Sequence, residues 1–447
     1  ANTQYLVINF LEAPVLAFFL AYLIRYYNVE TTNTFGYRLI DNDNLPVYIF
    51  MAVIVAIFMG LTVSAEEIIK DRKILKREAF LNLSWNSYLM SKVFVQFVIS
   101  AIQAFTFVII GNTILEIKGM YLHYWIMLFS SWTMANMLGL LISDSFKTVV
   151  TIYILIPFLV IPQIILSGII VKYEKLNPAI SSPSRIPFYG EIITARWAYE
   201  GLAVYQYKEN RYNRQFYPFE KRRSMADFKK HYWYNNLKDK VNESVRYYND
   251  PEKQDALAYN LLVLKNELDQ HNETLPALAF EDVDQLTPEQ VTPGLLNRLL
   301  DHLELIRRYY MRVSNAATAE IDERVKELEN RNKDAFLDMK FAHTNEQLEE
   351  FVTNSGEKPI VEVDGRLYQK TDPIYRDPEG RFLKAHFYAP SKRIFGKLVP
   401  TFWANVMVIW CMTIILYIAL SQRLLYRLLE SIGRISERLF PPPDNTV

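Results

Sequence analysis

The chain has 447 residues, of which 51% are hydrophobic and 14% aromatic, and its 49 basic and 49 acidic side chains leave no formal net charge. This balance gives no reason to expect a nucleic-acid partner. A single cysteine, Cys411, excludes an intrachain disulfide and a cysteine metal site, and the six scattered histidines form no paired metal-binding motif. No phosphate-binding loop and no catalytic triad pattern occurs, so we expect no catalytic site in this chain.

Apolar and polar residues are unevenly distributed along the chain. Residues 1–207 and 396–420 contain long apolar runs, whereas residues 208–395 are mostly polar. Apolar runs of this length are typical of helices that cross a bilayer. The pattern therefore predicts an all-α membrane protein with a large polar insertion. The chain starts at Ala1 without the basic region of a signal peptide, so we expect it to be a piece of a longer protein.

Hydropathy predicts six transmembrane helices. They span residues 9–27, 47–63, 93–115, 121–142, 149–171 and 399–420. The fourth is rich in small residues, which favours close packing between helices. The fifth contains Pro157 and Pro162, and prolines usually kink a helix.

A segment dense in charge, residues 64–92, lies between the second and third apolar runs. Glu66 and Lys70 form a favourable i,i+4 pair, and no Pro or Gly interrupts the segment, so the pattern predicts a helix. Five of its charges are Lys or Arg, which places the segment in the cytoplasm by the positive-inside rule. A short helix held between two membrane helices can transmit a push from a cytoplasmic partner into the membrane. The alternative is an ordinary solvated loop.

The segment after the fifth apolar run, residues 182–207, is aromatic but too polar to span. It predicts a re-entrant or interfacial helix pair that completes the first domain, residues 1–207. Counting five spans from a cytoplasmic start places the next section, residues 208–395, outside the cell membrane.

The insertion, residues 208–395, is predicted to be mostly helical. Thr287 and Pro288 predict the start of one helix, as cap and first-turn proline. The alternation of residues 360–368 around Asp364-Gly365 predicts one short β-hairpin. Leucines recur at helical spacing elsewhere in the insertion. They are Leu257, Leu261, Leu264, Leu268, Leu296, Leu299, Leu300 and Leu303.

After the sixth span, in residues 396–420, the chain ends in a tail, residues 421–447. Its apolar residues share one helical face, and four arginines lie beside that face. The pattern predicts a cytoplasmic amphipathic helix, in agreement with the count of six spans. The apolar residues are Leu424, Leu428, Ile432, Ile435 and Leu439, and the arginines are Arg423, Arg427, Arg434 and Arg438.

Residues 71–92 resemble the connection between the second and third helices of the G-subfamily, or White-type, ATP-binding cassette exporters. The matching pattern is an acidic-Arg start, an Arg-Glu pair, and then a Tyr and a Lys that enter the third helix. Here these are Asp71, Arg72, Arg77, Glu78, Tyr88 and Lys92. The resemblance implies that Glu66, Glu67, Asp71, Arg72, Arg77 and Glu78 couple the membrane helices to a nucleotide-binding domain.

Two further motifs carry the same resemblance. Residues 167–171 are similar to the end of the family's fifth helix, where two adjacent leucines form a hydrophobic plug, and this role falls on Ile169 and Ile170. Residues 186–202 are similar to the re-entrant segment that follows. The resemblance implies ATP and Mg at a nucleotide-binding domain, fused or separate, that this sequence does not contain. It also implies a second copy or a homologous half. The chain departs from the family in its much longer last outer loop, whose role the resemblance does not explain.

A cavity between the second and fifth helices is where the family binds substrate. The candidate lining residues are Met51, Ile54, Phe58, Ile154 and Phe158, and the alternative for each is packing or contact with lipid, because a membrane helix is apolar all round. An apolar, aromatic cavity suits an amphipathic or lipid-like substrate. Alternatives are a membrane-anchored binding or scaffold protein, with an envelope protein as the partner of the insertion, and a mechanotransmission complex. The insertion lacks disulfides, which favours a bacterial inner membrane.

Overall fold

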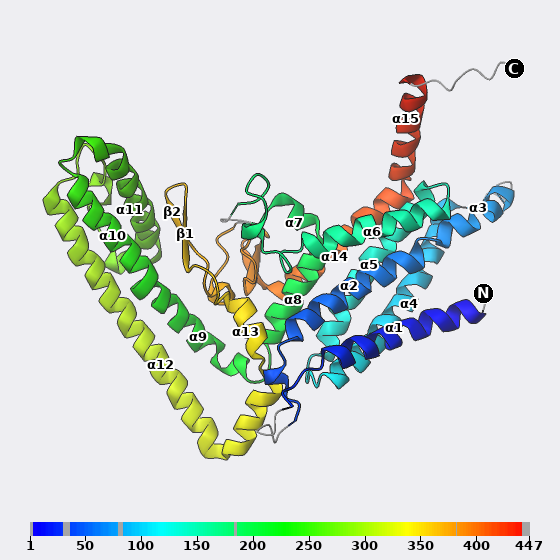
Figure 1. Cartoon of the computed structure of the whole chain (residues 1–447), viewed down its shortest axis with the longest axis horizontal. Coiled ribbons are helices and arrows are strands. Elements are labelled where there is room, and N and C mark those ends of the chain that lie inside the picture. The colour runs from blue at the N-terminus through cyan, green and yellow to red at the C-terminus, as the bar shows by residue number, and fades with distance from the viewer. Residues whose placement is uncertain (1–2, 30–35, 79–83, 183–185, 381, 440–447) are drawn as a thin grey trace.

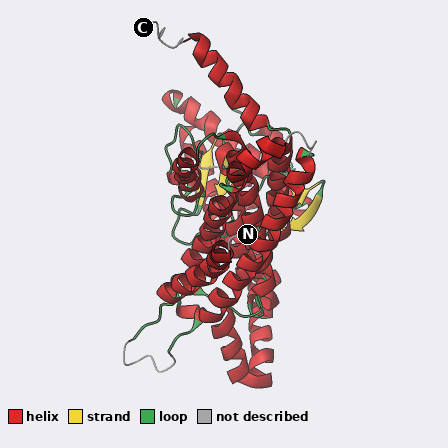
Figure 2. Cartoon of the chain, turned by 90° about the vertical axis from the view of Figure 1, so that its right-hand side faces the viewer, coloured by secondary structure: helices red, strands yellow, loops and turns green. Residues whose placement is uncertain are grey.

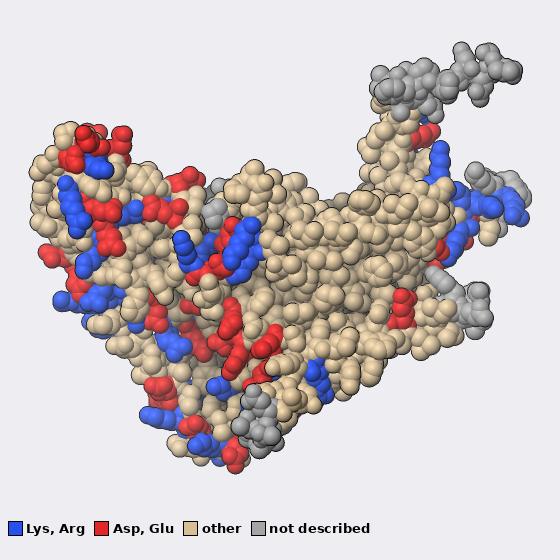
Figure 3. Space-filling view, in the orientation of Figure 1, with Lys and Arg blue, Asp and Glu red and all other residues tan. Residues whose placement is uncertain are grey.

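The computed structural model describes residues 3–29, 36–78, 84–182, 186–380 and 382–439. Figure 1 shows two parts that diverge from a common junction: a bundle of helices and an arm built from the insertion. The space-filling view shows charged side chains over the arm and at the far tip of the bundle, with a nearly uncharged band between them (Figure 3). This band is what a bilayer requires of the surface that it surrounds.

The bundle contains the helices expected to cross the membrane. Its members are α1 (Thr3–Ile24), α2 (Leu45–Ser64), α4 (Trp85–Ile114), α5 (Tyr121–Ser145), α6 (Val149–Ile165) and α14 (Thr401–Ser421). In the described part of the chain, five helical stretches are long and apolar enough to span. Helix α6, at the fifth predicted span, is apolar but has only 17 residues, so this span and the count of six stay predictions. The chain is an integral membrane protein.

Helix α6 ends earlier than the sequence predicts. It stops at Ile165, so Ile169 and Ile170 follow the helix instead of closing it. Two causes are visible. Pro157 and Pro162 each remove a backbone donor from the helix. Gly168 has a φ of +79°, a left-handed conformation that turns the chain away from the helix axis.

The third predicted helix begins earlier, and the charged segment is divided. Helix α3 covers Glu67–Glu78, and α4 starts at Trp85 behind the N-cap residue Ser84, whose hydroxyl accepts the N–H of Ser87. Tyr88 and Lys92 therefore lie in α4 and not in the helix that carries Asp71. The segment is two helices because a serine cap can start a new helix.

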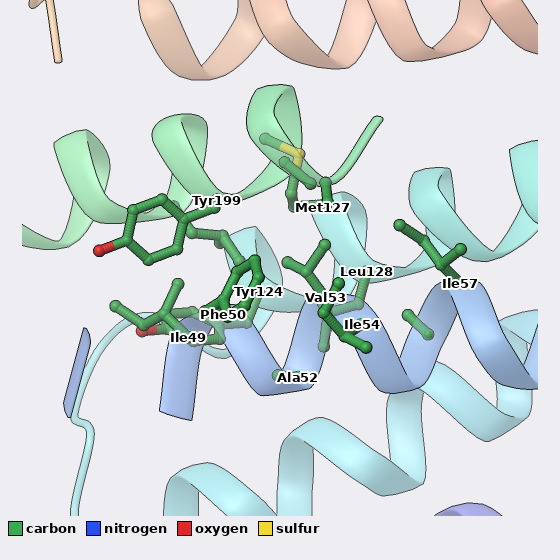
Figure 4. Close-up of a cluster of buried hydrophobic side chains, with 14 of the residues drawn as sticks. Ile49, Phe50, Ala52, Val53, Ile54, Ile57, Tyr124, Met127, Leu128 and Tyr199 are labelled. Carbon is green, nitrogen blue, oxygen red and sulfur yellow. The ribbon is translucent and has the colours of Figure 1, made fainter. Parts of the chain in front are cut away.

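The core of the bundle lies between α2, α5 and α8 (Thr194–Lys208). Figure 4 shows Ile49, Phe50 and Val53 of α2 packed together with Met127 of α5 and Tyr199 of α8. The rings of Phe50 and Tyr199 meet edge to face, with 6.0 Å between their centroids. Helix α8 is almost wholly buried, so it is a core element of the bundle. With the short helix α7 (Phe188–Ile192), it forms the predicted helix pair.

Helices α2 and α5 approach each other closely at Gly60. A Cβ atom on Gly60 would lie 2.7 Å from the carbonyl oxygen of Trp132 and 2.7 Å from the Cβ of Ala135. Small residues permit such an approach between membrane helices. We expect Gly60→Ala to destabilise the bundle by about 1–3 kcal/mol, because the contact includes backbone that cannot rotate away. Thermal unfolding in nanodiscs measures the effect.

A matched control for Gly60→Ala is Gly433→Ala in the C-terminal helix α15 (Leu424–Leu439). No atom lies within 4 Å of a Cβ atom placed there. Alanine is the better helix former, so this variant should unfold at the same or a slightly higher temperature. Equal losses in both variants would contradict close packing as the cause.

The insertion forms the arm from four main helices. They are α9 (Asn213–Asp227), α10 (Tyr234–Tyr247), α11 (Gln254–Thr274) and α12 (Pro293–His343). A π-helical turn, Phe228–Trp233, joins α9 to α10. Helix α12 bends at Asn332, whose backbone is non-helical and whose side chain accepts the N–H of Ala335. This bend turns the chain back toward the bundle (Figure 1).

The predicted leucine repeats are confirmed as the core of the arm. The four leucines of α11 and Leu296, Leu299 and Leu303 of α12 are buried, and Leu300 packs against them. The predicted helix start at Thr287 is wrong. Residues 287–290 form a turn, and α12 starts at Pro293 with Thr292 as its cap. The chain repeats Thr-Pro at these two places, and only the second precedes the leucine repeat.

The described residues between α13 (Glu346–Thr353) and α14 form two β-hairpins. The predicted one is confirmed as β1 (Ile360–Val363) and β2 (Arg366–Gln369), with Asp364 and Gly365 both at positive φ in the turn. A second, unpredicted hairpin pairs β3 (Ser391–Ile394) with β4 (Lys397–Pro400). It occupies the start of the predicted sixth span, so α14 begins only at Thr401.

A buried ion pair joins the insertion to the bundle. Lys392 of β3 donates to Glu200 of α8 at 2.5 Å, and neither side chain is exposed. Asn405 of α14 donates to the same carboxylate oxygen at 3.0 Å. Three elements that are far apart in sequence therefore meet at one buried carboxylate.

The arm contains a buried histidine, His271 of α11, that stacks on Trp233 with 5.4 Å between ring centroids. Burial, together with the charges of Lys229 and His302, lowers the pKa of His271 from 6.5 to about 4. The unfolded chain therefore binds more protons than the folded chain below pH 6.5. We expect the stability of the arm to be fully present above pH 6.5 and to fall as the pH drops toward about 4.

Circular dichroism melts across this pH range measure the effect of His271. His271→Phe keeps a flat ring beside Trp233 but cannot take up a proton, so its unfolding temperature should vary less with pH than that of the parent chain. Equal pH dependence in both proteins would assign the effect to other groups.

Candidate coupling site

Helix α3 lies at the tip of the bundle, where α2, α5 and α14 end and α4 and α6 begin (Figure 1). It follows α2 after only two residues, Ala65 and Glu66. Only a two-residue turn therefore separates α3 from the end of a membrane helix.

One face of α3 is held to α4 by a lysine that bridges two carboxylates. The Nζ atom of Lys92 lies 2.9 Å from Glu67 Oε2 and 2.8 Å from Asp71 Oδ2. The hydroxyl of Tyr88 donates to the same Asp71 oxygen at 3.0 Å. These side chains are mostly buried, so their interaction is screened less than an exposed ion pair.

Helices α3 and α5 each provide hydrogen-bond partners for the free backbone groups at the end of the other helix. Ser143 Oγ accepts the backbone N–H groups of Ile68 and Ile69 in the first turn of α3, at 3.1 and 3.0 Å. In return, Nη2 of Arg72 donates to the backbone carbonyls of Ser143 and Asp144 at the end of α5, at 3.3 and 2.8 Å. Free N–H groups at a helix start and free carbonyls at a helix end both need partners. This exchange therefore fixes α3 against α5.

The carboxylate of Asp144 connects this site to the C-terminal helix. Arg423 donates to both oxygens of Asp144, through Nε at 3.1 Å and Nη2 at 2.8 Å. Its guanidinium also lies 4.9 Å from the ring centroid of Trp85, at the start of α4. Glu66, before α3, contacts Lys70 and Tyr153 of α6. Helices α4, α5 and α6 thus contact the α3 region at the tip, and Arg423, between α14 and α15, contacts α4 and α5 beside it.

The opposite face of α3 is exposed. It carries Lys70, Lys73, Ile74 and Arg77, which recur at helical spacing, and Ile74 is 50% exposed. Figure 3 shows basic side chains gathered at this tip. Helix α3 therefore has one face bound to the bundle and one basic face, with an apolar residue at its centre, open to a partner.

The structure divides the residues predicted for coupling into two groups. Glu66, Glu67, Asp71 and Arg72 hold α3 to the bundle, Glu66 through Tyr153 of α6, whereas Arg77 is exposed. The side chain of Glu78 lies outside the described residues. Sequence reasoning missed Ser143, Asp144 and Arg423. The polar run Ser143-Asp144-Ser145 at the end of an apolar helix is the signal that marks the first two.

The residues predicted to line a substrate cavity differ in exposure, and their role stays a prediction. Met51, Phe58, Ile154 and Phe158 are between 36% and 69% exposed on the surfaces of α2 and α6, and Ile54 is buried in the core.

A cavity of about 450 Å³ lies at the other end of α6. One wall is the chain that follows α6, including Ile169, Lys172 and Tyr173, and the other belongs to the insertion, including Arg376 and Phe387. Of the two predicted plug residues, Ile169 lines this cavity and Ile170 is 63% exposed. The insertion therefore covers the end of α6.

Comparison with known proteins gives one match. A family described as ABC-2 type transporter matches residues 1–207. No curated protein and no solved structure matches the chain. The matched residues include α3 and its contacts with α4 and α5, but neither the insertion nor α14. ABC-2 membrane domains typically work with a nucleotide-binding partner. Residues 1–207 are thus similar to the membrane domain of ABC-2 type transporters, which supports the chain as the transmembrane component of an ATP-binding cassette transporter.

Proposed function

We propose that this chain is the transmembrane half of an ATP-driven exporter and that α3 couples it to a nucleotide-binding domain. The observation that carries the proposal is the division of α3 into two faces. Its inner face is fixed to α4 and α5 by Lys92, Ser143 and Arg72, and its outer face is exposed and basic. A helix held in this way moves as a unit with the bundle when a partner displaces it.

A nucleotide-binding domain, either fused to the chain or on a separate subunit, hydrolyses ATP with Mg and so drives this exporter. Two such domains switch between an open and a closed state. Helix α3 transmits the movement between these states to the membrane helices. The exposed faces of α2 and α6 then meet a second copy or a homologous half. In this arrangement Met51, Phe58, Ile154 and Phe158 line a cavity between the two chains.

The substrate that we propose is amphipathic or lipid-like. The exposed aromatic side chains Phe58 and Phe158 support this class, and so does the cavity at the end of α6. That cavity is lined by apolar side chains, including Ile169 and Phe387, and by charged ones of both signs, including Lys172 and Glu174. A lining with both apolar and charged groups suits an amphipathic ligand. In this scheme residues 208–395 lie on the extracytoplasmic side of a bacterial inner membrane, where the substrate is released.

The shape of the insertion favours a second candidate function. The arm has its own leucine core and diverges from the bundle (Figure 1). This shape suits an arm that contacts and moves an envelope protein. In such a mechanotransmission complex, ATP hydrolysis would move the arm without passing a substrate through the membrane.

The test compares two charge reversals in the assembly with its ATPase, reconstituted in proteoliposomes. Arg77→Glu changes the exposed face of α3, and Lys118→Glu changes an exposed lysine at the opposite end of the bundle. We expect Arg77→Glu to lower ATP hydrolysis and efflux of a fluorescent phospholipid by about tenfold, a loss of ~1.4 kcal/mol in coupling. Lys118→Glu should leave both unchanged. Equal effects of the two variants would contradict coupling through α3. Hydrolysis that depends on Arg77 without any efflux would favour mechanotransmission.

A further inference from the structure

The C-terminal helix α15 (Leu424–Leu439) turns sharply away from the membrane helix that precedes it. Helix α14 ends at Ser421, and Arg423 takes a positive φ of 54° between the two helices. Figures 1 and 2 both show α15 leaving the tip of the bundle at a steep angle to the membrane helices. Beyond its first turns it is open, because every residue from Ser431 to Ile435 is exposed.

Helix α15 exposes a continuous apolar stripe. Leu424, Leu428, Ile432 and Ile435 are 51%, 56%, 54% and 54% exposed and follow one another at helical spacing. Exposed stripes of this kind mark a surface that binds something apolar. Ile415 and Ile418 near the end of α14 are also exposed and come just before this stripe in the chain.

Arginines lie along one side of the stripe. Arg427 and Arg434 are exposed, and Arg423 is fixed at the start of the helix by Asp144. Among the α15 side chains that the structure describes, the acidic one is Glu430, which pairs with Arg434 at 2.7 Å. The helix therefore offers positive charge next to apolar side chains, and this combination matches a membrane surface with anionic lipids.

The covalent connection decides between a lipid and a protein as the occupant. Because α15 starts directly after a spanning helix, its first turn is held at the level of the lipid headgroups. Because it then turns at a steep angle to the membrane helices, it does not continue their path straight away from the membrane. We propose that α15 lies in the headgroup region of the leaflet at the α3 tip, with the Leu/Ile stripe among the acyl chains and its arginines on anionic headgroups. This inference needs neither ATP nor a transported substrate.

The proposal can be tested by placing one fluorescent probe on either face of α15. The exposed Cys411 is first replaced by serine so that each variant has a single thiol. Ile432→Cys and Glu430→Cys then carry the probe nitrobenzoxadiazole, and the two positions lie about 200° apart around the helix. The full chain is measured in nanodiscs of phosphatidylcholine with and without phosphatidylglycerol.

At position 432 we expect spin-labelled lipids to quench the probe and aqueous iodide not to quench it. At position 430 we expect iodide to quench the probe and spin-labelled lipids not to quench it. Adding Arg427→Gln and Arg434→Gln should reduce the shielding of position 432 in discs with phosphatidylglycerol, if the arginines bind anionic headgroups. Iodide access at position 432 in both lipid mixtures would overturn the proposal. So would shielding that appears only when an ATPase subunit or a second copy is added, because a protein would then cover the stripe.

Discussion

Lys92→Met is expected to release α3 from the bundle while leaving the membrane helices folded. Methionine keeps the length of the side chain but cannot donate to Glu67 and Asp71, which lie 2.9 and 2.8 Å from the lysine nitrogen. A hydrogen bond to a charged group contributes about 1.5–3 kcal/mol. The docked state of α3 should therefore become about 10- to 100-fold less favoured.

Hydrogen exchange of the α3 amides measures this release directly. We expect faster exchange in α3 and at the start of α4, with unchanged exchange in the core of α5. In the assembly with its ATPase, hydrolysis should continue while transport falls, because a loose helix no longer passes movement to α2.

The matched control for Lys92→Met is Lys73→Met, which removes the same charge from the exposed face of α3. This variant should leave exchange in α3 as it is in the parent chain. If Lys92→Met also left exchange unchanged, the two carboxylate contacts would not be what holds α3 in place.

Local patterns were enough to predict α3 and the first hairpin, because the signals that determine them are contained in a few consecutive residues. Asp364-Gly365 permits a tight turn, and a run of charge between two apolar segments must lie outside the bilayer. The leucine repeats of α11 and α12 are local in the same sense, since helical spacing alone brings their apolar side chains to one face.

The rest of the α3 site depends on contacts between distant residues, which single-sequence patterns do not contain. Asp144 and Arg423 are 279 positions apart, and no periodicity connects them. The sequence patterns that mark the early end of α6 and the bend of α12 are weaker than those of α3 and the first hairpin. A serine-glycine pair follows α6, and Asn332 interrupts a long helical pattern. Such residues are also common within helices, so their position alone does not indicate a break.

Lys392→Met is expected to cause the largest loss of stability, about 3–5 kcal/mol, by leaving the Glu200 carboxylate buried without its closest cation. The lysine and the carboxylate are 2.5 Å apart, and both side chains are fully buried. Arg196 is also buried, but its nearest nitrogen is 3.9 Å from Glu200 and it pairs with Glu191 at 2.7 Å, so it cannot replace Lys392 without moving. Thermal unfolding of the full chain in nanodiscs measures the loss.

The double variant Lys392→Met with Glu200→Gln separates charge from packing. Glutamine can still accept the hydrogen bond of Asn405 but has no charge to bury, so most of the stability should return. If the double variant were as unstable as Lys392→Met alone, lost packing of the lysine side chain would be the cause.

The position of the ion pair determines where Lys392→Met acts. Glu200 belongs to α8, which packs against α2 and α5, whereas Lys392 belongs to the hairpin that precedes α14. The leucine core of the arm shares no residue with this site. Hydrogen exchange should therefore rise in β3, β4 and the start of α14 and stay low in α11. The arm would then remain folded but lose its fixed attachment to the bundle, and any movement that α3 transmits into α2 would no longer reach it through this buried carboxylate.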